Sequence, residues 1–119
     1  MAKRNKQAEF VKWFGPLLDA LRELGYSGKP REVSDKIAKD LKLDDEFLDQ
    51  TLKSGTNKFH NQVAWARQYL TWEGLLDSSI RGTWKLTEKG KNTQLNYKEA
   101  HQVFLKWVEI IKKLERIKL

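Results

Sequence analysis

The chain has 119 residues, of which 39% are hydrophobic and 33% are charged, and its formal net charge is +7. This length and apolar content suit one domain with one core, and the positive charge favours an anionic partner, with nucleic acid ahead of a membrane surface or an acidic protein. The absence of cysteine excludes disulfides, cysteine nucleophiles and thiolate metal sites, and the two histidines are too far apart in the sequence to suggest a zinc site.

Residues 1–9 are polar and basic, and we expect them to form a flexible arm. No apolar segment follows them as in a signal peptide, and no run in the chain approaches the ~20 apolar residues that span a bilayer. We therefore expect a cytoplasmic protein that makes no membrane contact and needs no metal or other cofactor.

Three helices are predicted in the first half of the chain. Apolar residues recur every three or four positions over residues 9–24. A break or kink at Gly15-Pro16, or a helix that starts at Pro16, is expected because proline lacks a backbone donor. The second helix spans 30–41 and starts with a proline, and the third spans 45–52 after the N-cap residue Asp44. The third helix is expected to bury three apolar side chains, Phe47, Leu48 and Leu52.

A long amphipathic helix is predicted from Lys58 to Glu73, followed at once by a β-hairpin. Its apolar residues recur at steps of three and four and form one stripe, Phe59, Val63, Ala66 and Leu70. Gly74 is expected to end the helix, because glycine adopts the left-handed terminal conformation at little cost. The hairpin strands are predicted at 75–78 and 83–86, with a turn at 80–82.

A polar-faced helix joined directly to a basic hairpin is typical of a winged helix-turn-helix. The predicted fold class is therefore mainly α with a small β-hairpin, and a winged helix-turn-helix is expected to span residues 10–91. In such proteins the later helix lies in the major groove, with its first turns against base edges. Asn and Gln can bind adenine, and Arg or Lys can bind guanine. The candidate DNA contacts on this helix, on or beside the face opposite the apolar stripe, are Lys58, His60, Asn61, Gln62 and Arg67.

The hairpin supplies a candidate wing. Arg81 lies at its tip, where a cation can reach the sugar-phosphate backbone or the minor groove. A phosphate contact there would position the protein without reading the sequence. The candidate wing contacts are Ser79, Arg81 and Lys85. Trp84 and Leu86 alternate inward along the returning strand and are expected in the core.

Three aromatic residues of the long helix lie off or beside its apolar stripe, Trp65, Tyr69 and Trp72. Side chains this large are more often part of a core than of a ligand site, so we expect all three in the core. For Trp65 and Tyr69 the alternative is stacking on a base, because a pocket for a flipped base needs aromatic walls.

Residues 92–119 are expected to form a linker and a final helix from Tyr97 to Leu119. Asn96 and Glu99 stand at capping-box positions at its start. A helix of this length spans about 33 Å, which is longer than a winged-helix core usually needs. Part of its apolar face is expected to pack on the first helix, and the remainder to meet a second copy of the chain or another domain linked to it.

The run from Phe14 to Gly90 resembles the N-terminal domain of Mrr-type restriction endonucleases. The matching segments are Pro16-Leu17-Leu18, Leu21, Leu24-Gly25, Pro30-Arg31-Glu32-Val33, Asn61, Val63, Trp65-Ala66-Arg67, Tyr69-Leu70, Gly74-Leu75-Leu76, Arg81-Gly82-Thr83-Trp84-Lys85-Leu86-Thr87 and Gly90. The resemblance implies a winged-helix domain that recognises double-stranded DNA, often methylated or otherwise modified DNA. It also implies that this domain delivers a separate nuclease domain to the site.

That family's nuclease domain holds Mg²⁺ with an acidic residue followed by a Glu-or-Gln/x/Lys motif. Asp40-Leu41-Lys42 is the only D-x-K segment in this chain, and we interpret it as a solvated helix end because no second acidic motif stands at a suitable spacing. We therefore expect a DNA-binding domain that is not an enzyme by itself, either excised from a larger protein or a stand-alone binder.

Two other functions stay open at this point. The added C-terminal helix resembles the arrangement in PadR and MarR regulators, which would make the chain a small dimeric transcriptional regulator. A protein–protein interaction module is the other, because winged helices also serve as scaffolds.

Overall fold

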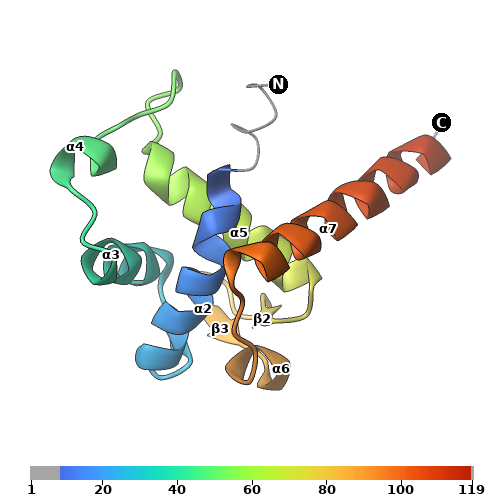
Figure 1. Cartoon of the computed structure of the whole chain (residues 1–119), viewed down its shortest axis with the longest axis horizontal. Helices are drawn as coiled ribbons and strands as arrows, with labels where there is room; N and C mark the ends of the chain where they lie inside the picture. The colour runs from blue at the N-terminus through green and yellow to red at the C-terminus, as the bar shows by residue number, and fades with distance from the viewer. Residues whose placement is uncertain (1–8, 119) are drawn as a thin grey trace.

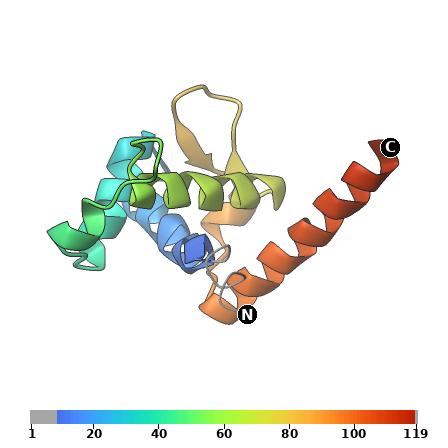
Figure 2. The ribbon, with the colours of Figure 1, turned by 90° about the horizontal axis from the view of Figure 1, so that it is seen from above.

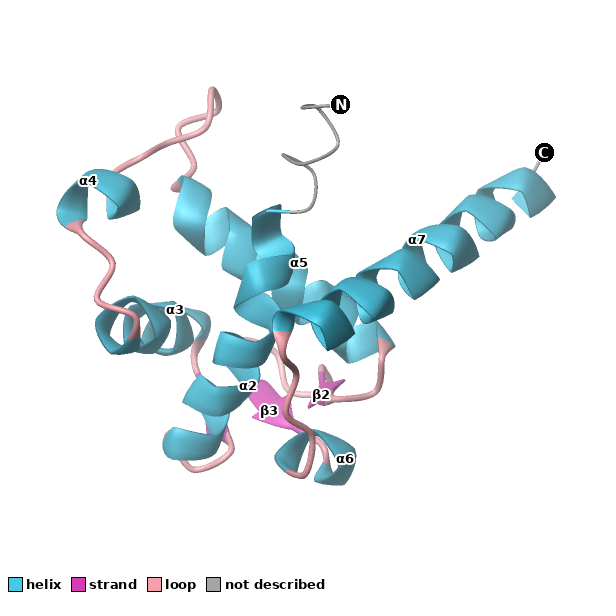
Figure 3. Cartoon of the chain, viewed as in Figure 1, coloured by secondary structure: helices cyan, strands magenta, loops and turns pink. Residues whose placement is uncertain are grey.

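The computed structural model describes residues 9–118, so the predicted arm lies outside the described residues except for Glu9. Figure 1 shows helices gathered around a small sheet, with the last helix projecting away from this body. Helices account for most of the described chain, and the short strands lie together beside α2 (Figure 3).

The first helical segment is divided between Trp13 and Phe14, and not at Gly15-Pro16, where a break, a kink or a helix start was predicted. A 3-10 helix, η1 (Glu9–Trp13), passes directly into α2 (Phe14–Glu23). Pro16 lies in the first turn of α2, where backbone N–H groups have no intrahelical partner, so its missing donor costs little. Gly15 is required beside it, because a Cβ atom there would collide with the backbone carbonyl of Leu95 in the later linker.

Three further helices precede the sheet's hairpin, α3 (Pro30–Asp40), α4 (Asp45–Leu48) and α5 (Lys58–Trp72). Helices α3 and α5 each end one residue before the predicted end. Asp44 caps α4 as expected, because its side chain accepts a hydrogen bond of 2.8 Å from the Phe47 amide.

Helix α4 is four residues shorter at its end than the prediction of 45–52. The chain leaves the helix because the Leu48 carbonyl accepts a 2.6 Å hydrogen bond from Asn57 Nδ2, and Thr51 then forms a β-bridge with Asn57. Leu52 is therefore exposed, which corrects the prediction that it is buried, whereas Phe47 and Leu48 pack half-buried against the core.

The predicted hairpin is part of a three-stranded antiparallel sheet. Strands β2 (Leu76–Asp77) and β3 (Trp84–Leu86) form the hairpin, and β1 (Ser27–Gly28) pairs with the other edge of β3, which gives the order β1-β3-β2. Strand β1 was not predicted, because a two-residue strand is too short to show a periodic pattern. Gly74 follows α5 with a φ of 84°, as predicted.

Helices α2 and α5 supply most of the core. The fully buried side chains of these helices include Phe14, Leu17, Leu18, Leu21, Phe59, Val63, Ala66 and Leu70. The whole predicted stripe of α5 is thus buried, and Leu76 and Leu86 add the inner surface of the sheet. The predicted fold class of mainly α with a small β-hairpin and a long C-terminal helix is confirmed.

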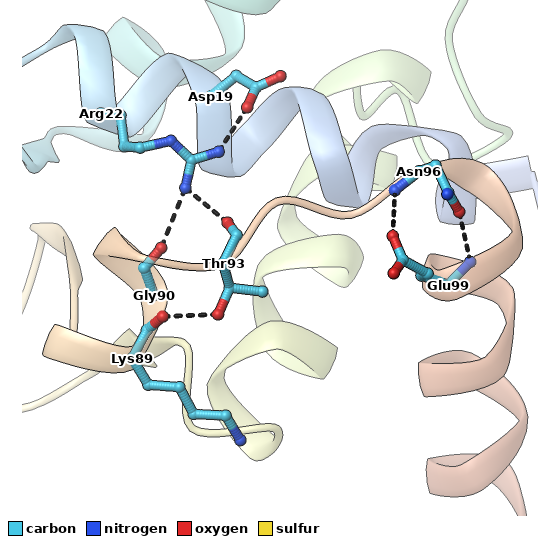
Figure 4. A network of polar contacts seen from close by, with 7 residues as sticks. All are labelled: Asp19, Arg22, Lys89, Gly90, Thr93, Asn96 and Glu99. Atoms are coloured by element: carbon cyan, nitrogen blue, oxygen red, sulfur yellow. Dashed lines mark hydrogen bonds and ion pairs between the residues drawn. The ribbon is translucent and has the colours of Figure 1, made fainter.

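The segment after the sheet is tied to α2 (Figure 4). The Arg22 guanidinium donates hydrogen bonds to the carbonyl of Gly90 (3.1 Å), in the short helix α6 (Glu88–Lys91), and to that of Thr93 (2.6 Å). Because hydrogen bonds to a charged donor are stronger than neutral ones, this contact fixes the path of the linker that leads to the last helix.

The last helix, α7 (Tyr97–Lys118), begins with the predicted capping box. The Glu99 amide donates to the Asn96 side chain at 2.8 Å, and the Asn96 amide donates to the Glu99 carboxylate at 3.0 Å (Figure 4). As predicted, the first half of α7 packs on the body, with contacts to η1, α2 and α5. The residues that make this contact are Ala100, Val103, Phe104, Trp107 and Val108.

Candidate nucleic-acid interface

Helix α5 presents one long side to solvent. Its first turn is fixed by Asn57, whose side-chain oxygen accepts a 3.0 Å hydrogen bond from the His60 amide. In Figure 2 the loop at 78–83, which we call the wing, projects past one side of α5, whereas η1, α2 and the start of α7 lie on the other side.

Two shallow hollows adjoin along this side of α5. The larger, of about 320 Å³, is bounded by α3, α5 and β3 and is lined by Pro30, Arg31, Ser34, Asn57, His60, Ala64 and Trp84. The smaller, of about 170 Å³, is lined by Asn61, Ala64, Trp65 and Gln68. Ala64 belongs to both, so the two hollows form one continuous surface. We call the outward residues of this surface the α5 face; they are Asn57, His60, Asn61, Ala64 and Gln68.

Two of the predicted recognition residues, His60 and Asn61, lie on the α5 face. His60 Nδ1 is 2.5 Å from the Ser34 hydroxyl of α3, which fixes the ring at the edge of the larger hollow. Burial lowers the pKa of His60 below its usual range and Arg31 lowers it further, although Asp35 acts in the opposite direction. The ring is therefore neutral at pH 7 and leaves its other nitrogen for a ligand.

Gln62 is not on the α5 face, which corrects its predicted place opposite the apolar stripe. Its side chain is 9% exposed and its oxygen accepts a 2.8 Å hydrogen bond from the indole N–H of Trp13. A buried indole N–H needs an acceptor, and Gln62 supplies it. The sequence held a signal for this, because Gln62 stands three residues after Phe59 and four before Ala66 and so borders the stripe.

Lys58 and Arg67 lie at the margins of the α5 face. Lys58 is drawn to the other side, toward η1, by Glu9 at 3.9 Å. The Arg67 guanidinium lies over the Trp84 ring, 5.6 Å from its centre, and its buried Nε has no hydrogen-bond partner among residues 9–118. Trp84 is correspondingly half-buried rather than a full core residue.

A third hollow, of about 210 Å³, separates Arg67 from the wing and is lined by Arg67, Asp77, Ser78, Ile80, Arg81, Gly82, Thr83 and Trp84. Arg67 of α5 and the wing thus line the same hollow.

Of the three predicted contacts, Lys85 is exposed on β3 beside the wing, and the wing itself exposes Ser79 and Arg81. Its bend depends on Asp77, which accepts a 2.8 Å hydrogen bond from the Ser79 amide, and on Gly82, whose φ of 77° suits glycine. The bonds from Ser79 lower the pKa of Asp77, so the carboxylate stays ionised.

Free cations flank the α5 face. Neither Arg81 nor Lys85 forms an ion pair with a described residue, and the same holds for Arg31 at the start of α3. Arg31 was not selected from the sequence, because only the packing of α3 against α5 brings it beside this surface.

The aromatic residues of α5 divide between core and surface. Tyr69 is buried as predicted, but Trp65 is 49% exposed and Trp72 is also exposed, which corrects their predicted place in the core. Trp65 stacks on Phe10 of η1, with ring centres 6.4 Å apart. Its indole forms the wall of the smaller hollow beside Asn61 and Gln68.

Comparisons with known families give one result. A family model described as the Mrr N-terminal domain matches residues 10–95. The searches of curated proteins and of solved structures gave no match. Within residues 9–118, no three His, Cys, Asp or Glu side chains gather to hold a metal ion, and none of the helices there has the length and apolarity to cross a membrane. Because the matched segment covers most of the chain, this protein belongs to the Mrr N-terminal domain family.

Proposed function

We propose that this chain is a recognition domain that binds double-stranded DNA through the α5 face and the wing. The observation that carries the proposal is that the α5 face, the start of α3 and the wing adjoin, and that Arg31, Arg81 and Lys85 take part in none of the ion pairs among residues 9–118. A surface of this kind offers a helix to the major groove and cations to the phosphates on either side.

Base contacts are assigned to the centre of the α5 face. Asn61 carries an amide that can form two hydrogen bonds with adenine, and the neutral ring of His60 can donate or accept one. Ala64 between them has no side chain beyond Cβ, so the helix can approach the bases closely. Gln68, one turn further along α5, extends the same row of polar groups.

Backbone contacts are assigned to the flanks. Arg31 at the start of α3 and Arg81 on the wing are suited to phosphates on opposite sides of the groove that α5 enters, and Lys85 and Ser79 extend the wing contact. Such contacts release counterions, so they give affinity and salt dependence without reading the sequence.

Family membership supports a more specific role in an Mrr-type restriction system. In this role the chain recognises methylated or otherwise modified DNA, and a nuclease domain outside residues 9–118 cuts it. Trp65 favours a modified target, because its exposed indole beside Asn61 offers an apolar surface to a base or its methyl group. Tyr69 is excluded from direct stacking by its burial.

The experiment is a fluorescence-anisotropy titration against two duplexes of one sequence, unmodified and methylated, at two salt concentrations. Tighter binding to the methylated duplex is the expected result. Equal and strongly salt-dependent binding to both duplexes would support DNA binding but contradict the proposed preference for modified DNA. Absence of binding at low salt would overturn both.

A dimeric transcriptional regulator is the second candidate function. It is favoured by one observation, the apolar end of α7, which lies outside the body and leaves room for a second copy. A regulator of this kind would bind paired half-sites about one helical turn apart, whereas the recognition domain would accept a single site.

A further inference from the structure

The second half of α7 carries apolar side chains that do not pack on the core formed by residues 9–118. Leu114 is 54% exposed and Ile117 is 77% exposed. Ile110 and Ile111 are half-buried, yet neither belongs to the residues that pack against the core. A run of four such residues on one helix is more than the isolated apolar side chains that are normal on a protein surface.

These residues continue a stripe that the body already uses. Positions spaced alternately by three and four run along α7 as Ala100, Val103, Trp107, Ile110, Leu114 and Ile117. The first three of them pack on the core and the last three do not. This spacing is that of the a and d positions of a coiled coil, so the uncovered half has the pattern of a helix that packs against another helix.

We propose that the second half of α7 is a homodimer interface, in which two copies of the helix pack antiparallel with Ile110 of one against Leu114 of the other. In this register Trp107 meets the second copy's Ile117 at each end. A two-fold contact requires only one surface patch that complements itself, and an alternating apolar stripe fulfils this requirement.

The charges beside the stripe favour the antiparallel pair. Glu109 lies on the same flank of α7 as Lys113 and Arg116, and none of the three forms an ion pair with a described residue. Antiparallel packing in the proposed register brings Glu109 of each copy close to Lys113 and Arg116 of the other, which offsets the repulsion between the two Lys113 side chains that meet at the two-fold axis. The symmetry forms this set of opposite charges twice.

The position of α7 leaves space for this partner. Figure 1 shows the helix extending beyond the body, so the two bodies of an antiparallel pair would lie at opposite ends of the paired helices. At the base of the projecting part, Trp107 lies against the exposed Trp72, with ring centres 5.9 Å apart. These indoles extend the apolar surface on which the end of the second copy's helix would lie.

The interface is small, so the dimer should be reversible. Its apolar part consists of a few side chains from each copy, below the size of a typical stable interface. Each chain also carries a net charge of +7, so long-range repulsion opposes association. Added salt should therefore strengthen the dimer, whereas it weakens any binding to DNA.

The test is sedimentation equilibrium of the full chain without DNA, over a wide concentration range and at two salt concentrations. The average mass should rise with concentration from 14.0 kDa toward twice this value, and more steeply at high salt. The double variant Leu114→Glu/Ile117→Glu should stay at the monomer mass throughout. Both side chains are exposed, so the variant should unfold at the same temperature as the parent chain.

Leu105→Glu is the matched control. Leu105 is 48% exposed on α7 but faces away from the stripe, so this variant should dimerise like the parent chain. Glu109→Lys should weaken the dimer, and adding Lys113→Glu in the same chain should restore it. A parent chain that is monomeric at every concentration, or a dimer unaffected by Leu114→Glu/Ile117→Glu, would overturn the proposal. Because no DNA is present, neither result bears on DNA binding.

Discussion

Helices α5 and α7 are both amphipathic, but they use their apolar faces to different extents. The stripe of α5 is buried from Phe59 to Leu70, and what remains exposed on this helix is a row of amides, a neutral imidazole and an indole. The stripe of α7 is buried only in its first half, and what remains exposed there is aliphatic. The fold thus leaves two different surfaces, one with hydrogen-bonding groups and one without.

This difference indicates two kinds of partner. Exposed amides beside unpaired cations suit a ligand with both hydrogen-bonding edges and negative charge, which describes DNA. Exposed leucine and isoleucine side chains on a regular helix suit another helix. The four predictions below test this distinction on α5, on the wing and at the contact between α5 and α7.

The largest effect is expected from the two glutamines of α5, which the structure places on opposite sides of the helix. Gln62→Ala should lower the free energy of unfolding by ~1–3 kcal/mol, because the buried indole N–H of Trp13 loses its acceptor. Gln68→Ala should change it by less than ~0.5 kcal/mol, because Gln68 lies at the surface. Urea unfolding measures both. Equal losses in the two variants would contradict the assignment of an inner and an outer side.

Gln62 also illustrates why part of the site could not be read from the sequence. A polar residue at the edge of an apolar stripe is equally compatible with solvent and with a buried partner, and the partner, Trp13, is 49 residues away in the chain. Trp65 is the reverse case, because a large aromatic residue is usually buried, yet Trp65 is 49% exposed and Phe10 is the only ring that stacks on it among residues 9–118. Both corrections come from contacts between η1 and α5 that no local pattern encodes.

Local signals predicted the rest of the fold well. The start of α5, the glycine stop at Gly74 and the caps of α4 and α7 depend on neighbouring residues, and all were confirmed. Strand β1 was missed because its only evidence is its pairing with β3, far along the chain. The position of Arg31 beside α5 was missed for the same reason, because it depends on how two helices pack.

The next effect concerns which DNA is preferred. Asn61→Ala should reduce discrimination between the preferred duplex and one with a changed base pair by ~1–3 kcal/mol, because one pair of hydrogen bonds to a base edge is lost. Competition binding with the two duplexes measures this difference, and Gln68→Ala shows whether the next turn contributes. If both variants kept the DNA preference of the parent chain, the α5 face would not contact the bases, and the base contacts would be assigned to the wing.

A smaller and uniform effect is expected at the wing. Arg81→Ala should weaken binding to all duplexes about equally and lower the slope of log affinity against log salt by ~0.9, the value for one lost phosphate contact. Lys112→Ala on α7 removes the same charge far from the wing and should leave the slope unchanged. If Arg81→Ala altered sequence preference but not the salt slope, Arg81 would be a base contact instead.

The smallest effect is a pH dependence at the point where α5 meets α7. Glu73, at the end of α5, accepts hydrogen bonds from Lys106 Nζ (2.6 Å) and the Trp107 indole (2.7 Å). Burial alone would raise the pKa of Glu73, but these hydrogen bonds and the nearby charges outweigh it, and the pKa is lowered from its ordinary value of 4.5. The contact therefore stabilises the fold fully above pH 4.5, and this contribution is lost as the pH falls through the folded-state pKa.

The variant Glu73→Gln distinguishes the pH dependence due to this contact from the loss of stability that all ionisable groups cause at low pH. At pH 7 the variant should be less stable by about 1 kcal/mol, because the amide retains an acceptor for Trp107 but loses the charge that holds Lys106. Its stability should then fall less than that of the parent chain as the pH is lowered toward 3, as followed by urea unfolding. Glu115→Gln, on the exposed part of α7, is the control and should keep the parent profile. If stability fell with pH equally in Glu73→Gln and in the parent chain, the ionised Glu73 would not contribute to holding α7 against α5. The apolar contacts between the two helices would then account for their packing.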